Sequence, residues 1–162
     1  MQNPTYKVMV VMERVPIQNR WASVQWRVAS VQPDEGGMPS PLRENLDGDV
    51  LRVTYPGLDL TIFRDEGEGY FLNLQSPEPS IFAIWRWNED ETEAIPSMVT
   101  LSYNEAARWM DSQEKVERVE MPIALYEVLS DWVSENYAPP EKKKRIRPQS
   151  FASKEGRYDS KM

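Results

Sequence analysis

The densest group of reactive side chains lies in LSYNEAARWMD, residues 101–111. It combines a tyrosine, two carboxylates, an arginine and a tryptophan, a set that can move protons or hold a polar ligand. Glu105 and Asp111, however, lie six positions apart on a predicted short helix, so they do not face each other as an acid/base pair must. We therefore assign no catalytic residue to this stretch.

The same stretch matches the start of a helix. Ser102 and Glu105 have the spacing of a capping box, in which the hydroxyl accepts a backbone N–H and the glutamate reaches back to the first residue. Trp109 and Met110 are expected to pack against the body of the protein. These roles favour a structural interpretation over an active site by about three to one. The side chains left for surface contacts are Tyr103, Asn104 and Arg108.

The composition narrows the chemistry further. The 162 residues include no Cys and no His. This excludes Cys or Ser/His nucleophiles, thiolate or imidazole zinc sites, protein-held iron–sulfur clusters and histidine-ligated haem. Carboxylate, lysine or tyrosine chemistry remains, as does a hard cation on oxygen ligands or no catalysis at all. We predict no resident cofactor and no metal site.

Three polar or glycine-containing segments are candidates for ligand sites. Residues 88–93 hold four carboxylates but lack the glycine and the ligand spacing of a calcium loop. Gly36-Gly37 and Gly67-Glu68-Gly69 lack the pattern of a phosphate-binding loop. Residues 88–93 are therefore predicted to be a solvated loop, and neither glycine segment is predicted to bind phosphate.

Charge divides the chain into two parts. Residues 139–162 carry 8 basic and 3 acidic residues, which leaves 11 basic and 23 acidic residues in 1–138. We expect one acidic globular domain, 1–138, and a basic, disordered tail, 139–162. The tail suits an acidic protein or an anionic membrane surface, although a solvated arm is equally consistent with it. Nucleic acid is not an expected partner, because the acidic body would repel it. The tail residues proposed for binding are Lys142, Lys143, Lys144, Arg145 and Arg147.

The first two-thirds of the chain alternates with the period of strands. Val24, Trp26 and Val28 point to one side of a predicted strand. Residues 50–75 predict a meander of three short strands, with turns at Pro56-Gly57 and at 66–69. The runs 8–12 and 81–87 are apolar on both faces and predict central strands.

The period changes to that of helices after residue 100. The short helix ends near residue 112, a strand follows at 116–119, and Pro122 opens an amphipathic helix to about Tyr137. The predicted class is α+β and mainly antiparallel β. It comprises roughly six to eight strands in a curled, barrel-like or sandwiched sheet, with a short helix and a C-terminal amphipathic helix. Residues 33–49 form the one long irregular connection, which has no assigned role.

Nothing in the sequence predicts a membrane span or an export signal. The longest wholly apolar run, residues 8–12, is far shorter than the ~20 residues of a transmembrane helix. We therefore expect a cytoplasmic protein.

Three segments carry a family resemblance: MERVPIQNRWASVQWRV at 12–28, GYFLNLQSPEPSIFAIWR at 69–86 and SYNEAARWMDSQEKVERVEMP at 102–122. With the following helix and basic tail, they resemble a bacterial family classed as a domain of unknown function. Its members are typically encoded beside genes for molybdenum- or tungsten-dependent formate dehydrogenases. The likeness covers most of 8–147, without 33–49 and the last fifteen residues.

The resemblance implies a role in expression, maturation or assembly of formate dehydrogenase. The expected partner is a formate dehydrogenase subunit or one of its maturation proteins, and the expected protein is a non-enzymatic accessory factor. The alternative is a molybdopterin- or guanine-nucleotide-handling enzyme of cofactor biosynthesis, a label that some members carry. The resemblance transfers no catalytic residue. Its motifs supply the surface candidates Arg20, Trp21, Asn73, Tyr103, Asn104 and Arg108.

Overall fold

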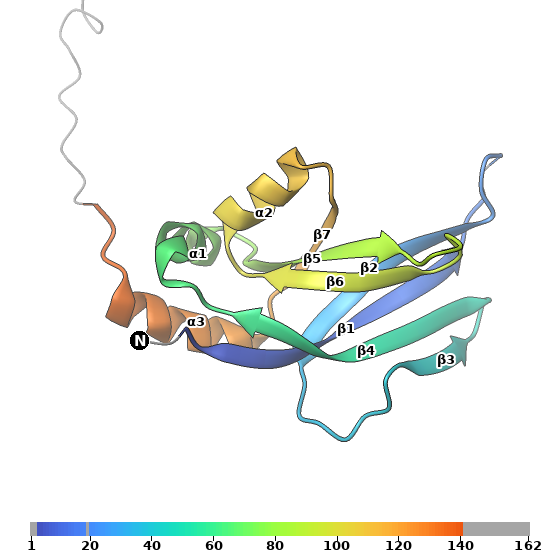
Figure 1. The fold of residues 1–162 in the computed structure, drawn as a ribbon, viewed down its shortest axis with the longest axis horizontal. Coiled ribbons are helices and arrows are strands. Elements are labelled where there is room, and N and C mark those ends of the chain that lie inside the picture. The colour runs from blue at the N-terminus through green and yellow to red at the C-terminus, as the bar shows by residue number, and fades with distance from the viewer. Residues whose placement is uncertain (1–2, 19, 141–162) are drawn as a thin grey trace, which may run out of the picture.

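The computed structural model describes residues 3–18 and 20–140 (Figure 1). In this part of the chain seven strands form two antiparallel sheets, accompanied by three α-helices and a short 3₁₀ turn. The predicted α+β class is confirmed, and the sheets do not close into a barrel. The elements are β1 (Thr5–Pro16), β2 (Val24–Pro33), β3 (Leu42–Leu46), β4 (Val50–Thr61), η1 (Arg64–Glu66), α1 (Gly67–Gln75), β5 (Ser80–Trp87), β6 (Ala94–Thr100), α2 (Tyr103–Asp111), β7 (Lys115–Glu120) and α3 (Ile123–Asn136).

The two predicted central strands are confirmed. The larger sheet has the order β2-β1-β4-β3 and the smaller one β6-β5-β7, so β1 and β5 each have a neighbour on both sides. In β1, Val8, Val10 and Met12 are fully buried and face the other sheet. In β5, Ile81, Ala83 and Trp85 face the same core, whereas the opposite face of β5 lies under α2. Burial on both sides explains the unbroken apolar run of β5.

The helices gather at one end of the sandwich and on the outer face of the smaller sheet (Figure 1). α1 and α3 are joined through their aromatic rings, because Tyr70 meets Trp132 edge-on with ring centres 5.6 Å apart. The predicted amphipathic helix is confirmed as α3, which buries Leu125, Leu129 and Val133. None of the helices in residues 3–18 and 20–140 is long and apolar enough to cross a membrane.

The predicted meander at 50–75 is wrong in its first half. β4 runs without interruption through Pro56-Gly57, where the sequence predicted a turn. Val8 pairs with Leu58 but Val10 pairs with Tyr55, so β4 carries one extra residue opposite Met9. Gly57 adopts a positive φ of 84° there. Its N–H donates to Asp34 Oδ2 at 2.8 Å, and these features define a β-bulge rather than a chain reversal.

The prediction is also wrong for residues 67–75, which form α1 instead of a turn and a third strand. The strand-like spacing of Tyr70, Leu72 and Leu74 around Asn73 is a coincidence. In the helix Tyr70 and Asn73 lie one turn apart and are buried, while Leu72 is 42% exposed. Gly67 and Gly69, which indicated a turn, are buried within α1. Because glycine has no side chain, α1 can approach its neighbours closely at these positions.

The long connection 33–49 is shorter than the sequence predicted. Leu42–Leu46 pairs with Val50–Thr54 of β4 as the edge strand β3. Only residues 34–41 therefore remain as an irregular loop between β2 and β3. The predicted tail contacts at 142–147 lie outside the described residues.

The two sheets are tied together along both sides. On one side the Glu117 carboxylate of β7 accepts hydrogen bonds from the Val28 N–H of β2 and from Trp85 Nε1, each at 2.8 Å. On the other side Arg43 of β3 makes two hydrogen bonds to Glu93, at 3.2 and 2.5 Å, just before β6. Side-chain contacts thus replace the backbone ladder that a closed barrel would have.

Glu13 makes stability depend on pH. Its side chain is 8% exposed on the outer face of the larger sheet, where Arg27 and Arg52 each donate to it at 2.9 Å. Hydrogen bonds first from Arg27 and then from Arg52 lower the pKa of Glu13, against the opposing effect of burial. This stabilisation is complete above the unfolded pKa of ~4.3 and is lost as pH falls through the lower, folded pKa.

We expect Glu13→Gln to lower the free energy of unfolding at pH 7 by about 1–2 kcal/mol, a value discounted for the half-exposed arginines. The variant should also lose less stability than the wild type between pH 5 and pH 3. Urea unfolding at several pH values measures both effects, with the exposed Glu35→Gln as control. Parallel stability–pH curves for wild type and Glu13→Gln would show that Glu13 is not the responsible group.

Candidate functional site

The motif at 101–111 holds α2 against α1. Ser102 is the N-cap residue of α2, and its hydroxyl oxygen accepts the N–H of Glu105 at 3.0 Å. This half of the predicted capping box is confirmed. The Glu105 carboxylate does not return to the N-cap but accepts a hydrogen bond from Thr100 Oγ1 at 2.5 Å. The Ser102 hydroxyl in turn donates to Glu66 Oε1 at 2.6 Å, which links the cap to the start of α1.

This polar cluster has the parts of a nucleophile and a base but no access for a substrate. Ser102 is fully buried, and Glu66 is 9% exposed. Arg108 Nη2 donates to the second oxygen of Glu66, and the carboxylate raises the pKa of that guanidinium. Tyr70 lies nearby, and burial raises the pKa of its hydroxyl, which accepts the Phe63 N–H at 2.8 Å. The cluster therefore positions α1 and α2 in this conformation.

The three α2 residues proposed for surface contacts already have partners. Asn104 Nδ2 donates to Glu68 Oε1 at 3.1 Å, and Arg108 pairs with Glu66. The Tyr103 ring stacks edge-on against Phe82, with ring centres 5.5 Å apart. The expected packing of Met110 is wrong, because its side chain is 50% exposed on the far side of the helix, whereas Trp109 is half-buried.

Asn73 is not a surface residue. It is fully buried, and Nδ2 donates to the carbonyl oxygens of Ser80 and Leu101 at 2.7 and 2.8 Å. Its Oδ1 accepts the N–H of Ser80 at 2.9 Å. Asn73 thus joins α1 to the start of β5 and to the end of β6, a structural role that a strand-like interpretation of residues 70–74 concealed.

Arg20 and Trp21 lie at a distance from the α2 motif. They belong to the β1–β2 hairpin, which extends beyond the sheets at the end remote from α1 and α3 (Figure 1). Trp21 is 84% exposed, and the Arg20 guanidinium lies 5.9 Å from its ring centre. The six motif residues therefore do not converge on one site.

One concave surface of the described residues was not predicted from the sequence. It is a groove of about 860 Å³ between the 76–80 segment on one side and the end of β7 with the start of α3 on the other. The Met121 N–H donates to the Pro79 carbonyl at 3.1 Å and joins the two walls. The apolar lining residues are Leu74, Pro77, Pro79, Val119, Met121, Ile123 and Tyr126.

Ile123 gives the groove an unusual apolar rim. It is 76% exposed, and Tyr126 one turn later is 39% exposed. The available sequence signal was the position of Ile123, which falls outside the apolar stripe of α3 formed by residues 125, 128, 129, 132 and 133. Ile123 and Tyr126 together form an exposed apolar edge along the groove, and a contiguous apolar surface indicates a contact surface.

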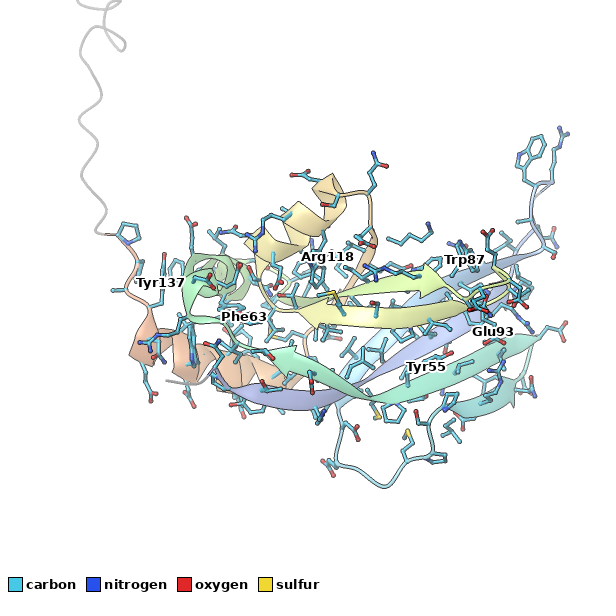
Figure 2. The ribbon with its side chains drawn as sticks, in the orientation of Figure 1. Tyr55, Phe63, Trp87, Glu93, Arg118 and Tyr137 are labelled. Carbon is cyan, nitrogen blue, oxygen red and sulfur yellow. The ribbon has the colours of Figure 1, made fainter. Side chains whose placement is uncertain are left out.

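The charged groups around the groove are mostly acidic. Glu78 and Glu120 line it together with Arg118. Arg118 lies under α2 (Figure 2) and is engaged there, because it donates to Ser80 Oγ at 2.9 Å and to the Glu78 carbonyl at 3.2 Å. Its guanidinium also lies 5.7 Å from the Phe82 ring centre. Because Arg118 is already hydrogen-bonded and Glu78 and Glu120 remain, the rim carries a net negative charge.

Comparison with known proteins identifies the family. No curated protein and no solved structure matches the chain. The family described as "Protein of unknown function (DUF3305)" matches residues 7–146, and the match includes residues 33–49, which the resemblance noted in the sequence left out. Because this match covers most of the chain, the protein belongs to the DUF3305 family.

Proposed function

We propose that this protein is a non-enzymatic accessory factor that binds a partner protein through the groove beside α3. The observation that carries the proposal is the exposure of Ile123, which presents 76% of its surface to solvent beside Tyr126. Covering an exposed isoleucine or tyrosine contributes roughly 1.5–3 kcal/mol for each side chain that becomes fully buried. Such side chains on the edge of a concave surface are typical anchors of a protein interface.

The walls of the groove favour an extended segment as the occupant. Pro77 and Pro79 fix the backbone of one wall, and the Met121 to Pro79 hydrogen bond holds it against the other. A preformed surface loses little conformational entropy on binding. Because Glu78 and Glu120 make the rim acidic, we expect the bound segment to combine apolar side chains with flanking lysine or arginine residues.

We propose a formate dehydrogenase subunit, or one of its maturation proteins, as the partner. This proposal is supported by the resemblance to a family whose members are typically encoded beside formate dehydrogenase genes. The buried position of Ser102 and the lack of Cys and His in the chain are consistent with a binding role rather than catalysis. The basic tail is proposed as an auxiliary contact.

The proposal predicts that a double variant, Ile123→Asp with Tyr126→Asp, loses the partner. Tagged full-length protein is purified from its native host grown with formate and molybdate, and co-purifying proteins are quantified by mass spectrometry. We expect the wild type to recover a formate dehydrogenase subunit or maturation protein, and the double variant to recover about tenfold less or lower still. Met110→Asp is the matched control, because Met110 is also an exposed apolar helix residue but lies outside the groove.

The possible outcomes separate the parts of the proposal. Equal recovery by the wild type and the double variant would remove the groove as the binding surface. Failure of the wild type to recover either class of protein would remove formate dehydrogenase as the target. A chain that ends at Ala138 tests the auxiliary role of the tail, and unchanged recovery would remove it.

A further inference from the structure

We propose that Arg14 anchors a second binding surface, which takes a carboxylate flanked by apolar side chains on a partner protein. Arg14 lies on β1 and continues the core-facing series of Val8, Val10 and Met12. Its cross-strand neighbours are Trp26 of β2 and Leu51 of β4, which are 5% and 7% exposed. A permanent positive charge thus points between the two sheets at their open end.

Among the strand arginines, Arg14 differs in having no polar partner within residues 3–18 and 20–140. Its Nε is buried and makes no hydrogen bond to the residues that the structure describes. A buried donor without an acceptor lowers stability, so Arg14 carries a cost that the other strand arginines avoid. The other strand arginines all have polar partners: Arg27 and Arg52 pair with Glu13, Arg43 with Glu93, Arg86 with Glu114, and Arg118 bonds Ser80.

Exposed apolar side chains surround this end of the sandwich. Val24 and Trp87 are each 41% exposed, and both lie on the core-facing sides of their strands. Trp87 packs edge-on against Trp85 with ring centres 5.0 Å apart, and Figure 2 shows it at the end remote from α3. Lys115 Nζ adds positive charge 5.7 Å from the Trp85 ring centre. The surface therefore combines the positive charges of Arg14 and Lys115 with the partly exposed side chains of Val24 and Trp87.

Charge complementarity defines the occupant. A glutamate or aspartate side chain of a partner would pair with the accessible part of the half-buried Arg14 guanidinium, and its apolar neighbours would cover Val24 and Trp87. The acidic loop 88–93 lies at the same end and repels acidic chains in general. Binding then requires that one carboxylate reach Arg14 directly, which gives specificity rather than general attraction.

The test uses the full-length chain and two capped tripeptides, leucine–glutamate–leucine and leucine–glutamine–leucine. NMR follows the Arg14 Nε–H and Trp87 indole N–H signals during titration. We expect saturable shifts with the glutamate peptide, and binding about tenfold weaker with the glutamine peptide. Arg14→Gln should lose the preference for the glutamate peptide. Arg27→Gln, on the opposite face of the same sheet, should keep it.

Thermal unfolding separates this role from a structural one. If Arg14 serves binding, Arg14→Met should leave the melting temperature unchanged or raise it, because the variant removes an unpaired buried donor. A melting temperature that falls by several degrees would overturn the proposal, as would equal affinity for the two peptides or shifts that do not saturate. The groove variant Ile123→Asp with Tyr126→Asp should bind the glutamate peptide normally, which keeps this test independent of the proposed function.

Discussion

Asn73→Ala is expected to lower the free energy of unfolding by about 3–5 kcal/mol, a large part of the roughly 5–15 kcal/mol of a typical domain. The substitution removes three hydrogen bonds at a fully buried position. It leaves the N–H and C=O of Ser80 and the C=O of Leu101 without these partners, in a space that water does not reach. Urea unfolding followed by tryptophan fluorescence measures the loss.

Two further variants define the mechanism at Asn73. Asn73→Asp keeps the size of the side chain but places an oxygen against two carbonyl oxygens, so it should destabilise about as strongly as alanine. Asn136→Ala is the control, because Asn136 is exposed and makes a local hydrogen bond within α3. We expect it to change stability by no more than about 0.5 kcal/mol. A similarly small loss for Asn73→Ala would mean that the hydrogen bonds of Asn73 contribute little.

Gly69→Ala is expected to be the most damaging glycine substitution in the described chain. A Cβ at this position would lie 2.1 Å from Ser102 Oγ and 3.0 Å from the Asn104 backbone nitrogen. Ser102 cannot yield freely, because its hydroxyl bonds both Glu66 and the Glu105 N–H. Separating α1 from α2 should cost about 3 kcal/mol or more, measured by thermal and urea unfolding.

A control and a compensating variant test this interpretation. Gly67→Ala would place its Cβ 2.6 Å from Cδ1 of Tyr137, a ring after the end of α3 that can move aside, so it should be milder. Combining Gly69→Ala with Ser102→Ala removes the closest contact and leaves the Ser102 Cβ at 3.1 Å. We expect the double variant to lose less stability than the sum of the two single variants. Strictly additive losses would show that the Ser102 hydroxyl is not the obstacle.

The sequence predicted the parts of the fold that local pattern determines. β1 and β5 were recognisable by their unbroken apolar runs, which in β5 reflect burial on both faces. Ser102 was recognisable because a helix N-cap has a short-range hydrogen-bonding signature. α1 was missed because its glycines and its buried Asn73 serve contacts with residues far along the chain, which periodicity does not record.

The candidate surfaces were harder to predict, for a related reason. The groove exists because the 76–80 segment meets the start of α3, and this contact depends on the tertiary fold. Arg14 could be placed on the core-facing side by continuing the alternation of β1, but its lack of an acceptor depends on which residues the second sheet brings opposite. The α2 motif, in contrast, was visible in the sequence and proved to be mainly architectural.

The Glu117 carboxylate, which bridges the two sheets by accepting the Val28 N–H and Trp85 Nε1–H, also affects how copies of this chain can associate. An edge strand with free N–H groups is a template for pairing with another molecule. At Val28 of β2 the donor is already occupied by a carboxylate, which also brings negative charge to the strand edge. The β6 edge strand contains Pro96, which has no N–H to offer. The bridge that holds the two sheets together therefore also disfavours the intermolecular strand addition through which sandwich proteins aggregate.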